Sequence, residues 1–221
     1  MIERTTGVIL RTRPLTETSL IVQWLTADFG RLSTVAKGAR RPKSPFRGKL
    51  DLFYLGEFNF LRSRRSDLHI LCEVGLLETH AALRRELKHL QQASYCAALI
   101  EQTTETETPL PAVFHLFKGM LDWLPTAPPQ PRTIFAFELK LLHELGLEPD
   151  LTKTNLGLAA RQLVQELARA DWPQIAQLKP AQAQILELRQ FLHGFLIYHL
   201  GKLPTGRGAA LKGSTRSSEP S

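Results

Sequence analysis

The sequence is short of the residues that hold zinc sites and disulfide frameworks together. It contains only two cysteines, Cys72 and Cys96, and their spacing matches no zinc-ligand pattern. Cys72 lies in an apolar run typical of a strand, and Cys96 in a run typical of a helix. We therefore expect two buried free thiols, which suit a reducing cytoplasm.

Long hydrophobic runs are also missing. No stretch approaches 18 uninterrupted apolar residues, the length that a membrane-spanning helix needs. The opening residues 1–6 (MIERTT) do not place a basic region before a long apolar one, as a signal peptide does. We expect no membrane association, and a cytoplasmic protein.

The sequence has none of the short motifs that identify common catalytic sites. There is no phosphate-binding Gly-x-x-x-x-Gly-Lys-Ser/Thr loop, no His-Glu-x-x-His pair and no Gly-x-Ser-x-Gly turn. One arrangement leaves a metal-dependent nuclease open, because Asp67, His69 and Glu73 alternate in a predicted strand and would share a face. A solvated strand face with mixed polar residues is the more ordinary interpretation. We predict no enzyme, no cofactor and no metal.

The positive charge is unevenly distributed along the 221 residues. Lys and Arg outnumber Asp and Glu by 13 to 8 in residues 1–80 and by 4 to 1 in residues 201–221, whereas residues 81–200 carry 11 against 12. The net charge of +7 therefore resides at the two ends of the chain. This distribution favours contact with a polyanion by the terminal regions.

The first third of the chain has the pattern of a small β-barrel. Short runs rich in β-branched, leucine and aromatic residues are separated by turn signals such as Asp28-Phe29-Gly30, and Gly56 suggests a bulge. Five such runs within about 78 residues predict a five-stranded OB-fold barrel over residues 1–78. The runs are residues 8–10, 19–26, 31–37, 50–61 and 68–74.

Apolar residues then recur every three or four positions, starting at Leu76 and Leu77, which predicts amphipathic helices. About five helices follow, with Gly146 and Gly201 as helix-ending signals. The predicted fold class is thus α+β with two domains, an OB-fold barrel and an all-α domain at 79–203. Residues 204–221 are poor in large apolar residues, and we expect a disordered basic tail there.

The most informative segment for function lies between residues 31 and 49. It contains no Asp or Glu, and its Gly and Pro residues predict an exposed, mobile loop whose cations contact phosphates. A second basic cluster falls in the predicted hairpin between the last two strands. The candidate DNA-binding residues are Arg31, Lys37, Arg40, Arg41, Lys43, Arg47 and Lys49 in the loop, and Arg62, Arg64 and Arg65 in the hairpin.

Aromatic residues near this loop allow two interpretations. Single-strand binders combine a cationic groove with aromatic platforms on which bases stack. Aromatic residues at strand spacing are more often core, and this is the interpretation we favour for Phe58 and Phe60. The same alternatives apply to Phe46, Phe53 and Tyr54.

Several segments resemble bacterial RecO proteins. Residues 7–20 (GVILRTRPLTETSL), 29–32 (FGRL) and 35–40 (VAKGAR) are similar to the family's opening strands and its most recognisable stretch. The pattern over residues 135–146 resembles its central helix, and residues 189–202 resemble its closing helix. The resemblance covers most of the chain and is strongest over residues 7–45.

The resemblance implies a non-enzymatic mediator of DNA repair and recombination. It implies binding to single- and double-stranded DNA, annealing of complementary strands, and partnership with RecR and with the acidic C-terminal tail of single-stranded DNA-binding protein. Together these lead to loading of RecA, near the nucleoid. From the residues alone, an RNA-binding OB-fold chaperone remains an alternative that would use the same loop.

Two regions of the helical half bear on this resemblance. Many relatives carry a four-cysteine zinc module after a Leu-Gly-x-x-Pro-x-Leu segment. Here residues 145–151 match that segment, but residues 152–155 (TKTN) have no cysteine, so we predict no structural zinc. For the acidic tail, Arg132 and Lys140 near Phe135 offer a candidate slot, with a core role for Phe135 as the alternative.

Overall fold

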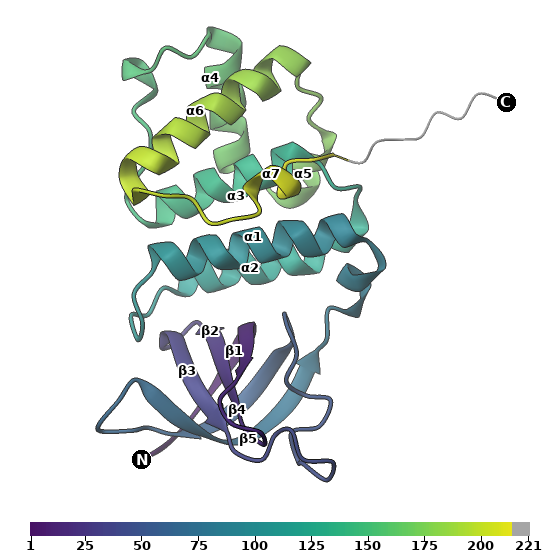
Figure 1. Ribbon diagram of the computed structural model, residues 1–221. Coiled ribbons are helices and arrows are strands. Elements are labelled where there is room, and N and C mark those ends of the chain that lie inside the picture. The colour runs from purple at the N-terminus through teal and green to yellow at the C-terminus, as the bar shows by residue number, and fades with distance from the viewer. Residues whose placement is uncertain (214–221) are drawn as a thin grey trace, which may run out of the picture. The chain divides into compact units, whose positions relative to one another are not determined.

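The computed structural model describes residues 1–213, and these form two compact units (Figure 1). The first unit contains residues 1–81 together with residues 104–118. The second contains residues 82–103 and the chain from Gly119 onward. The first unit therefore includes a later segment that the sequence pattern places in the helical domain.

The first unit is a closed barrel of five strands in the order β1-β2-β3-β5-β4. All neighbouring strands are antiparallel except β3 and β5, which are parallel. This confirms the predicted OB-fold barrel. The strands are β1 (Ile2–Pro14), β2 (Leu20–Thr26), β3 (Gly30–Ala36), β4 (Leu55–Leu61) and β5 (Leu68–Glu78).

The barrel interior is filled by the alternating apolar side chains of the strands. Trp24 stacks on Phe58 with ring centroids 4.0 Å apart, and its indole N–H donates to the Thr34 hydroxyl at 2.9 Å. Phe58 and Phe60 are almost fully buried, so the core interpretation is confirmed for both. Burying side chains of this size stabilises the barrel by about 1.5–3 kcal/mol each.

The predicted turn at Asp28-Phe29-Gly30 connects β2 to β3, and it requires glycine. Gly30 has φ +64°, and a Cβ atom there would lie 1.9 Å from the carbonyl oxygen of Thr108. Thr26 closes the turn, since its hydroxyl accepts from the Phe29 N–H at 3.1 Å. Glycine is thus needed both for the left-handed backbone and for the close approach of residue 108.

A bulge in β5 overturns the prediction that Cys72 is buried. Phe60 pairs with Leu71 while Asn59 pairs with Glu73, so Cys72 is the extra residue of the bulge and is exposed. Cys96 is buried as predicted, and burial raises the pKa of its thiol. A second register shift lies beside Gly56, as the sequence suggested, but the extra residue is Leu77 on β5 and not Gly56 itself.

The prediction of a helix starting at Leu76 is wrong. The strand β5 continues to Glu78, with Leu76 paired to Gly56 and Glu78 to Leu55. Leu76 and Leu77 are exposed. The apolar residues that recur every three or four positions from Leu76 onward therefore do not form the buried face of one helix. Sheet pairing with residues about twenty positions earlier in the chain decided this segment.

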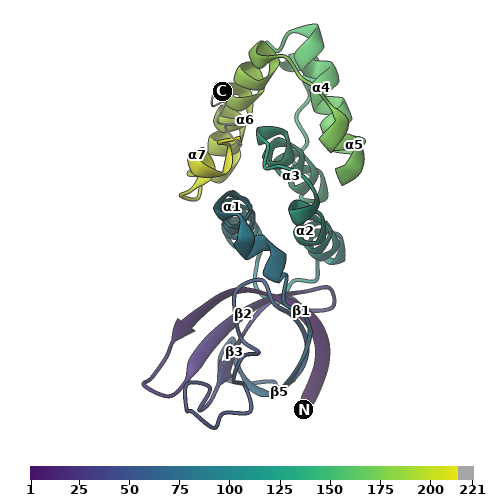
Figure 2. The same ribbon diagram turned by 90° about the vertical axis from the view of Figure 1, so that its right-hand side faces the viewer.

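The helical unit is organised around α3, which packs against α1, α4, α5 and α6 (Figure 2). Within residues 1–213, no helix is both long enough and apolar enough to cross a bilayer. Gly146 and Gly201, with φ +69° and +72°, follow the ends of α3 and α6 as predicted. The helices are α1 (Leu87–Thr103), α2 (Pro111–Trp123), α3 (Pro131–Glu144), α4 (Leu158–Arg169), α5 (Trp172–Gln177), α6 (Gln182–Leu200) and α7 (Arg207–Ala210), with shorter 3-10 turns at Ala81–Arg85, Leu124–Thr126 and Leu151–Lys153.

The segment after α6 is ordered as far as the structure describes it, so the expected disordered tail is wrong for residues 204–213. Arg207 is 7% exposed, and its guanidinium binds both carboxylate oxygens of Glu138 at 2.7 and 2.8 Å. Glu138 is itself fully buried in α3 and accepts from the Tyr95 hydroxyl at 2.6 Å. The ion pair of Arg207 and the burial of Ala210 and Leu211 together hold this segment in place. Residues 214–221 of the predicted tail lie outside the described part.

Candidate nucleic-acid interface

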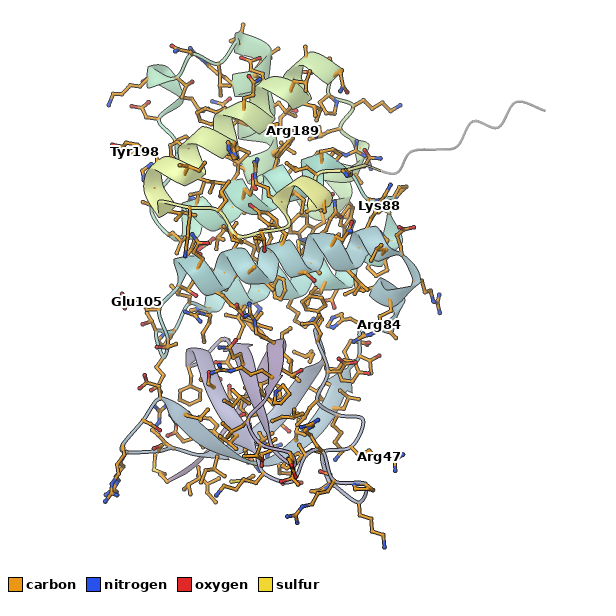
Figure 3. All side chains as sticks on the ribbon, in the orientation of Figure 1. Arg47, Arg84, Lys88, Glu105, Arg189 and Tyr198 are labelled. Atoms are coloured by element: carbon orange, nitrogen blue, oxygen red, sulfur yellow. The ribbon has the colours of Figure 1, made fainter. Side chains whose placement is uncertain are left out.

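The connection between β3 and β4 presents five of the ten predicted DNA-binding residues to solvent. Figure 3 shows the side chain of Arg47 extending outward from this connection. No acidic residue occurs in the span 31–49. We call the connection, residues 37–54, the basic loop. Its five exposed cations are Lys37, Arg40, Arg41, Lys43 and Arg47.

The basic loop is built from consecutive turns, so its cations have defined positions instead of the mobile ones expected. The Arg41 N–H donates to the carbonyl of Gly38 at 3.0 Å, and the Arg47 N–H donates to that of Ser44 at 3.2 Å. Phe46 is 7% exposed and belongs to the hydrophobic core of the barrel. Because this side chain is anchored in the core, the loop is fixed at its middle.

Two of the arginines are also fixed through their side chains. Arg40 donates from its backbone N–H to the Thr18 carbonyl and from Nη1 to the Thr16 carbonyl, both at 3.0 Å. Arg47 donates from Nη1 to the Pro42 carbonyl at 3.3 Å. A guanidinium has five N–H donors, so one such bond orients the group and leaves donors for an anion. Lys49 differs, since it is half-buried and its Nζ donates to the Val74 carbonyl at 3.2 Å.

Arg31 and Arg62 hold the barrel to the segment that follows α1. Arg31 donates from Nε to the Thr104 hydroxyl at 2.8 Å and from Nη2 to the Thr104 carbonyl. Arg62 forms ion pairs with Glu3, at 2.6 Å, and with Glu107. Its hydrogen bonds lower the pKa of Glu3. Both arginines lie in the first unit and are largely engaged by protein groups.

We expect Arg62→Met to lower the free energy of unfolding by about 1 kcal/mol. The change removes two half-exposed ion pairs, and it also removes the cation–π contact of the guanidinium, which lies 5.4 Å from the Phe29 ring centroid. It should leave the salt dependence of DNA binding unchanged. Denaturant unfolding and a salt titration of DNA affinity measure the two effects. An Arg62→Met protein with normal stability and a smaller salt slope would return Arg62 to the DNA-binding set.

The second predicted cluster is only partly available. Arg64 and Arg65 are exposed in the β4–β5 hairpin, whereas Arg62 beside them is paired. Figure 1 shows this hairpin on the opposite side of the barrel from the basic loop. The two clusters therefore do not form one continuous site, and the hairpin is a separate candidate contact.

The predicted DNA-binding set omitted two exposed arginines on β1. Arg11 and Arg13 are exposed and alternate with the half-buried Thr12. In the sheet, Arg11 pairs with Gln23, which pairs with Ser33, so a polar row crosses β1, β2 and β3. The Arg-Thr-Arg alternation itself was the available signal, because residues two apart in a strand share a face.

The alternative of a nuclease metal site at Asp67, His69 and Glu73 is not supported by the geometry. His69 is 1% exposed, and its Nε2 lies 2.8 Å from a carboxylate oxygen of Glu107. Glu73 lies beyond the bulge, is exposed, and accepts from the Asn59 amide at 3.4 Å. Asp67 precedes β5. The bulge at Cys72 reverses which residues of β5 face the barrel interior, so His69 and Glu73 do not share a face. Within residues 1–213, no three His, Cys, Asp or Glu side chains are grouped to hold a metal.

The proposed slot at Arg132, Phe135 and Lys140 does not form. Phe135 is fully buried in α3, where it belongs to the core. Arg132 donates to the Ala176 carbonyl at 2.7 Å and Lys140 to the Ala168 carbonyl at 2.9 Å. Partial burial lowers the pKa of both cations. Because α3 is covered by neighbouring helices, its aromatic residues face protein and not a groove.

The closed five-stranded barrel, with an exposed basic loop that has no acidic residue before Asp51, defines the class: an OB-fold protein with a helical second unit. Residues 1–80 match the family model "Recombination protein O N terminal", and residues 84–157 match "Recombination protein O C terminal". These two models together cover more than half of the chain. The chain belongs to the RecO family.

Curated relatives named DNA repair protein RecO agree with this assignment. The relative from Anaeromyxobacter sp. (strain K) is 36% identical over 146 residues, which is 66% of this chain and 58% of the relative. That from Rhodopirellula baltica is 32% identical over 143 residues, 65% of this chain and 53% of the relative. That from Bacillus subtilis is 29% identical over 151 residues, 68% of this chain and 58% of the relative. The matches thus span little more than half the length of these relatives.

Proposed function

We propose that the chain acts in DNA repair and recombination as a mediator that binds single- and double-stranded DNA and anneals complementary strands. The observation that carries the proposal is the basic loop, whose five exposed cations occur in a span with no acidic residue. Contacts of this kind go to phosphates and do not read sequence. Family membership and the names of the relatives support the repair role.

Annealing follows from charge neutralisation. Two complementary strands repel one another through their phosphates, and cations presented at fixed positions reduce that repulsion while the bases remain free to pair. Arg64 and Arg65 on the other side of the barrel offer a second contact, so one molecule has cations for two segments of nucleic acid. Lys49, whose Nζ is turned to the Val74 carbonyl, contributes less than the five exposed cations.

Protein partners are part of the proposal through the family. We propose that the chain works with RecR and with the acidic C-terminal tail of single-stranded DNA-binding protein, and so helps to load RecA onto coated DNA. Since Phe135 is buried, no surface is assigned to the acidic tail. The role includes no catalytic step.

The proposal is tested by the affinity for a labelled single strand over a salt series, measured by fluorescence anisotropy. Five phosphate contacts give an expected log–log slope of about −3.5, so affinity falls by about 100-fold between 50 and 200 mM salt. Addition of the complementary strand should give faster pairing than without protein. Absence of binding at low salt would overturn the proposal, and a several-fold preference for RNA of the same sequence would favour an RNA chaperone.

A further inference from the structure

The basic loop and the start of β2 form a hollow of about 360 Å³. Contacts between exposed cations and phosphates do not explain why this hollow is there. The buried and half-buried residues that line it, which we call the floor, are apolar, and the exposed arginines that line it form what we call the rim. No acidic side chain lines it. The floor consists of Leu20, Ala39, Phe46 and Leu50, the rim of Arg40, Arg41 and Arg47, and Pro42 and Gly48 complete the wall.

The hollow is held in shape by the barrel. Phe46 is part of the hydrophobic core, and Leu20, Ala39 and Leu50 pack against that core from its edge. On the rim, the guanidiniums of Arg40 and Arg47 are oriented by bonds to backbone carbonyls. A ligand therefore meets a preformed apolar floor and preformed charges, which reduces the entropy lost on binding.

Size and chemistry restrict what the hollow can take. Its volume is at the lower end of the range of about 300–1,000 Å³ for small-ligand sites, so it admits one ring system and not a helix. A planar ring fits between an apolar floor and arginine guanidiniums, which stack on bases in nucleic-acid complexes. The three arginines of the rim require that the ligand carry negative charge beside the ring.

We propose that this hollow receives one unstacked base of a single-stranded nucleic acid, whose neighbouring phosphates contact Arg41 and Arg47. The inference rests on the proposed function and deepens it, because it makes the basic loop selective for unpaired strands. A duplex cannot place a base in the hollow without unstacking and unpairing it, which costs a few kcal/mol. Backbone contacts by Lys37 and Lys43 remain open to both forms of DNA.

The wild-type protein supplies the first test. Its affinity is measured for oligo(dT) and for an oligomer of the same length in which every base is replaced by an abasic tetrahydrofuran unit. Both have the same phosphates, so purely electrostatic binding treats them alike. We expect the abasic strand to bind about tenfold more weakly, because stacking contributes to affinity at each engaged base.

The second test fills the hollow without changing charge. Ala39→Leu adds three carbon atoms to the floor, and Ala27→Leu, in the turn between β2 and β3, adds the same atoms elsewhere as a control. Thermal unfolding confirms that both variants fold. We expect Ala39→Leu to lower affinity for oligo(dT) about five- to tenfold, with no change for the abasic strand or for duplex, and Ala27→Leu to match the wild type.

The outcomes separate this inference from the proposed function. Equal, salt-dependent binding of oligo(dT) and the abasic strand overturns the base site but leaves the mediator proposal intact. Equal binding together with displacement of both strands by an acidic peptide ending in an apolar residue would assign the hollow to a peptide instead. No binding of either strand at low salt overturns both proposals.

Discussion

Reversing the charge of Arg40 and Arg41 is expected to weaken single-strand binding at least about 20-fold in 0.1 M salt. Each arginine that no longer neutralises a phosphate reduces the salt slope by about 0.7, and two such arginines account for about 25-fold in affinity at this salt. Repulsion by the two new carboxylates weakens binding further. The slope should fall from about −3.5 to about −2, and annealing of complementary strands should slow.

The matched control is a second pair of neighbouring arginines, Arg84 and Arg85, in the 3-10 turn Ala81–Arg85. Arg84→Glu/Arg85→Glu changes the net charge by the same amount, but both residues lie outside the basic loop. We expect near-normal affinity and annealing for this control. If the two double variants weaken binding equally, the effect reflects the total charge of the protein, and the basic loop is not the site. Unchanged annealing by the Arg40/Arg41 variant would remove the loop from the annealing proposal.

Replacing Arg207 by methionine is expected to lower the free energy of unfolding of the helical unit by about 3–5 kcal/mol. The change leaves the Glu138 carboxylate fully buried without its cation, and removing one partner of a buried ion pair has an effect of this size. Tyr95 donates to the same carboxylate, and burial followed by that negative charge raises the pKa of its hydroxyl. It therefore remains a neutral donor, which cannot replace the charge of the guanidinium. The segment around α7 should detach when this anchor is removed.

Denaturant unfolding followed by far-ultraviolet circular dichroism measures this loss, since the signal comes chiefly from the helices. Arg169→Met serves as the control, because Arg169 is exposed in the last turn of α4, and we expect a change within about 0.5 kcal/mol. Adding Glu138→Gln to Arg207→Met should recover part of the loss, since the amide is neutral and still accepts from Tyr95. A loss no larger than that of Arg169→Met would show that the ion pair does not stabilise the unit.

Local signals in the sequence determined the turn at Gly30, the helix ends at Gly146 and Gly201, and the basic loop. Each depends on residues within a few positions of one another: a glycine supplies a backbone conformation that other residues resist, and a run rich in Lys and Arg that contains Gly and Pro is mostly exposed. The five strands follow from the same kind of local pattern. These features are therefore readable before any tertiary contact is known.

Tertiary structure alone decided which cations are free and which positions face inward. Arg31 is bound to Thr104 and Arg207 to Glu138, partners 73 and 69 positions away, and nothing near either arginine in the sequence predicts these bonds. The bulge at Cys72 likewise depends on how β5 pairs with β4, and it reversed the predicted faces beyond it. Sequence periodicity specifies a face only while the register is regular, and long-range pairing sets the register.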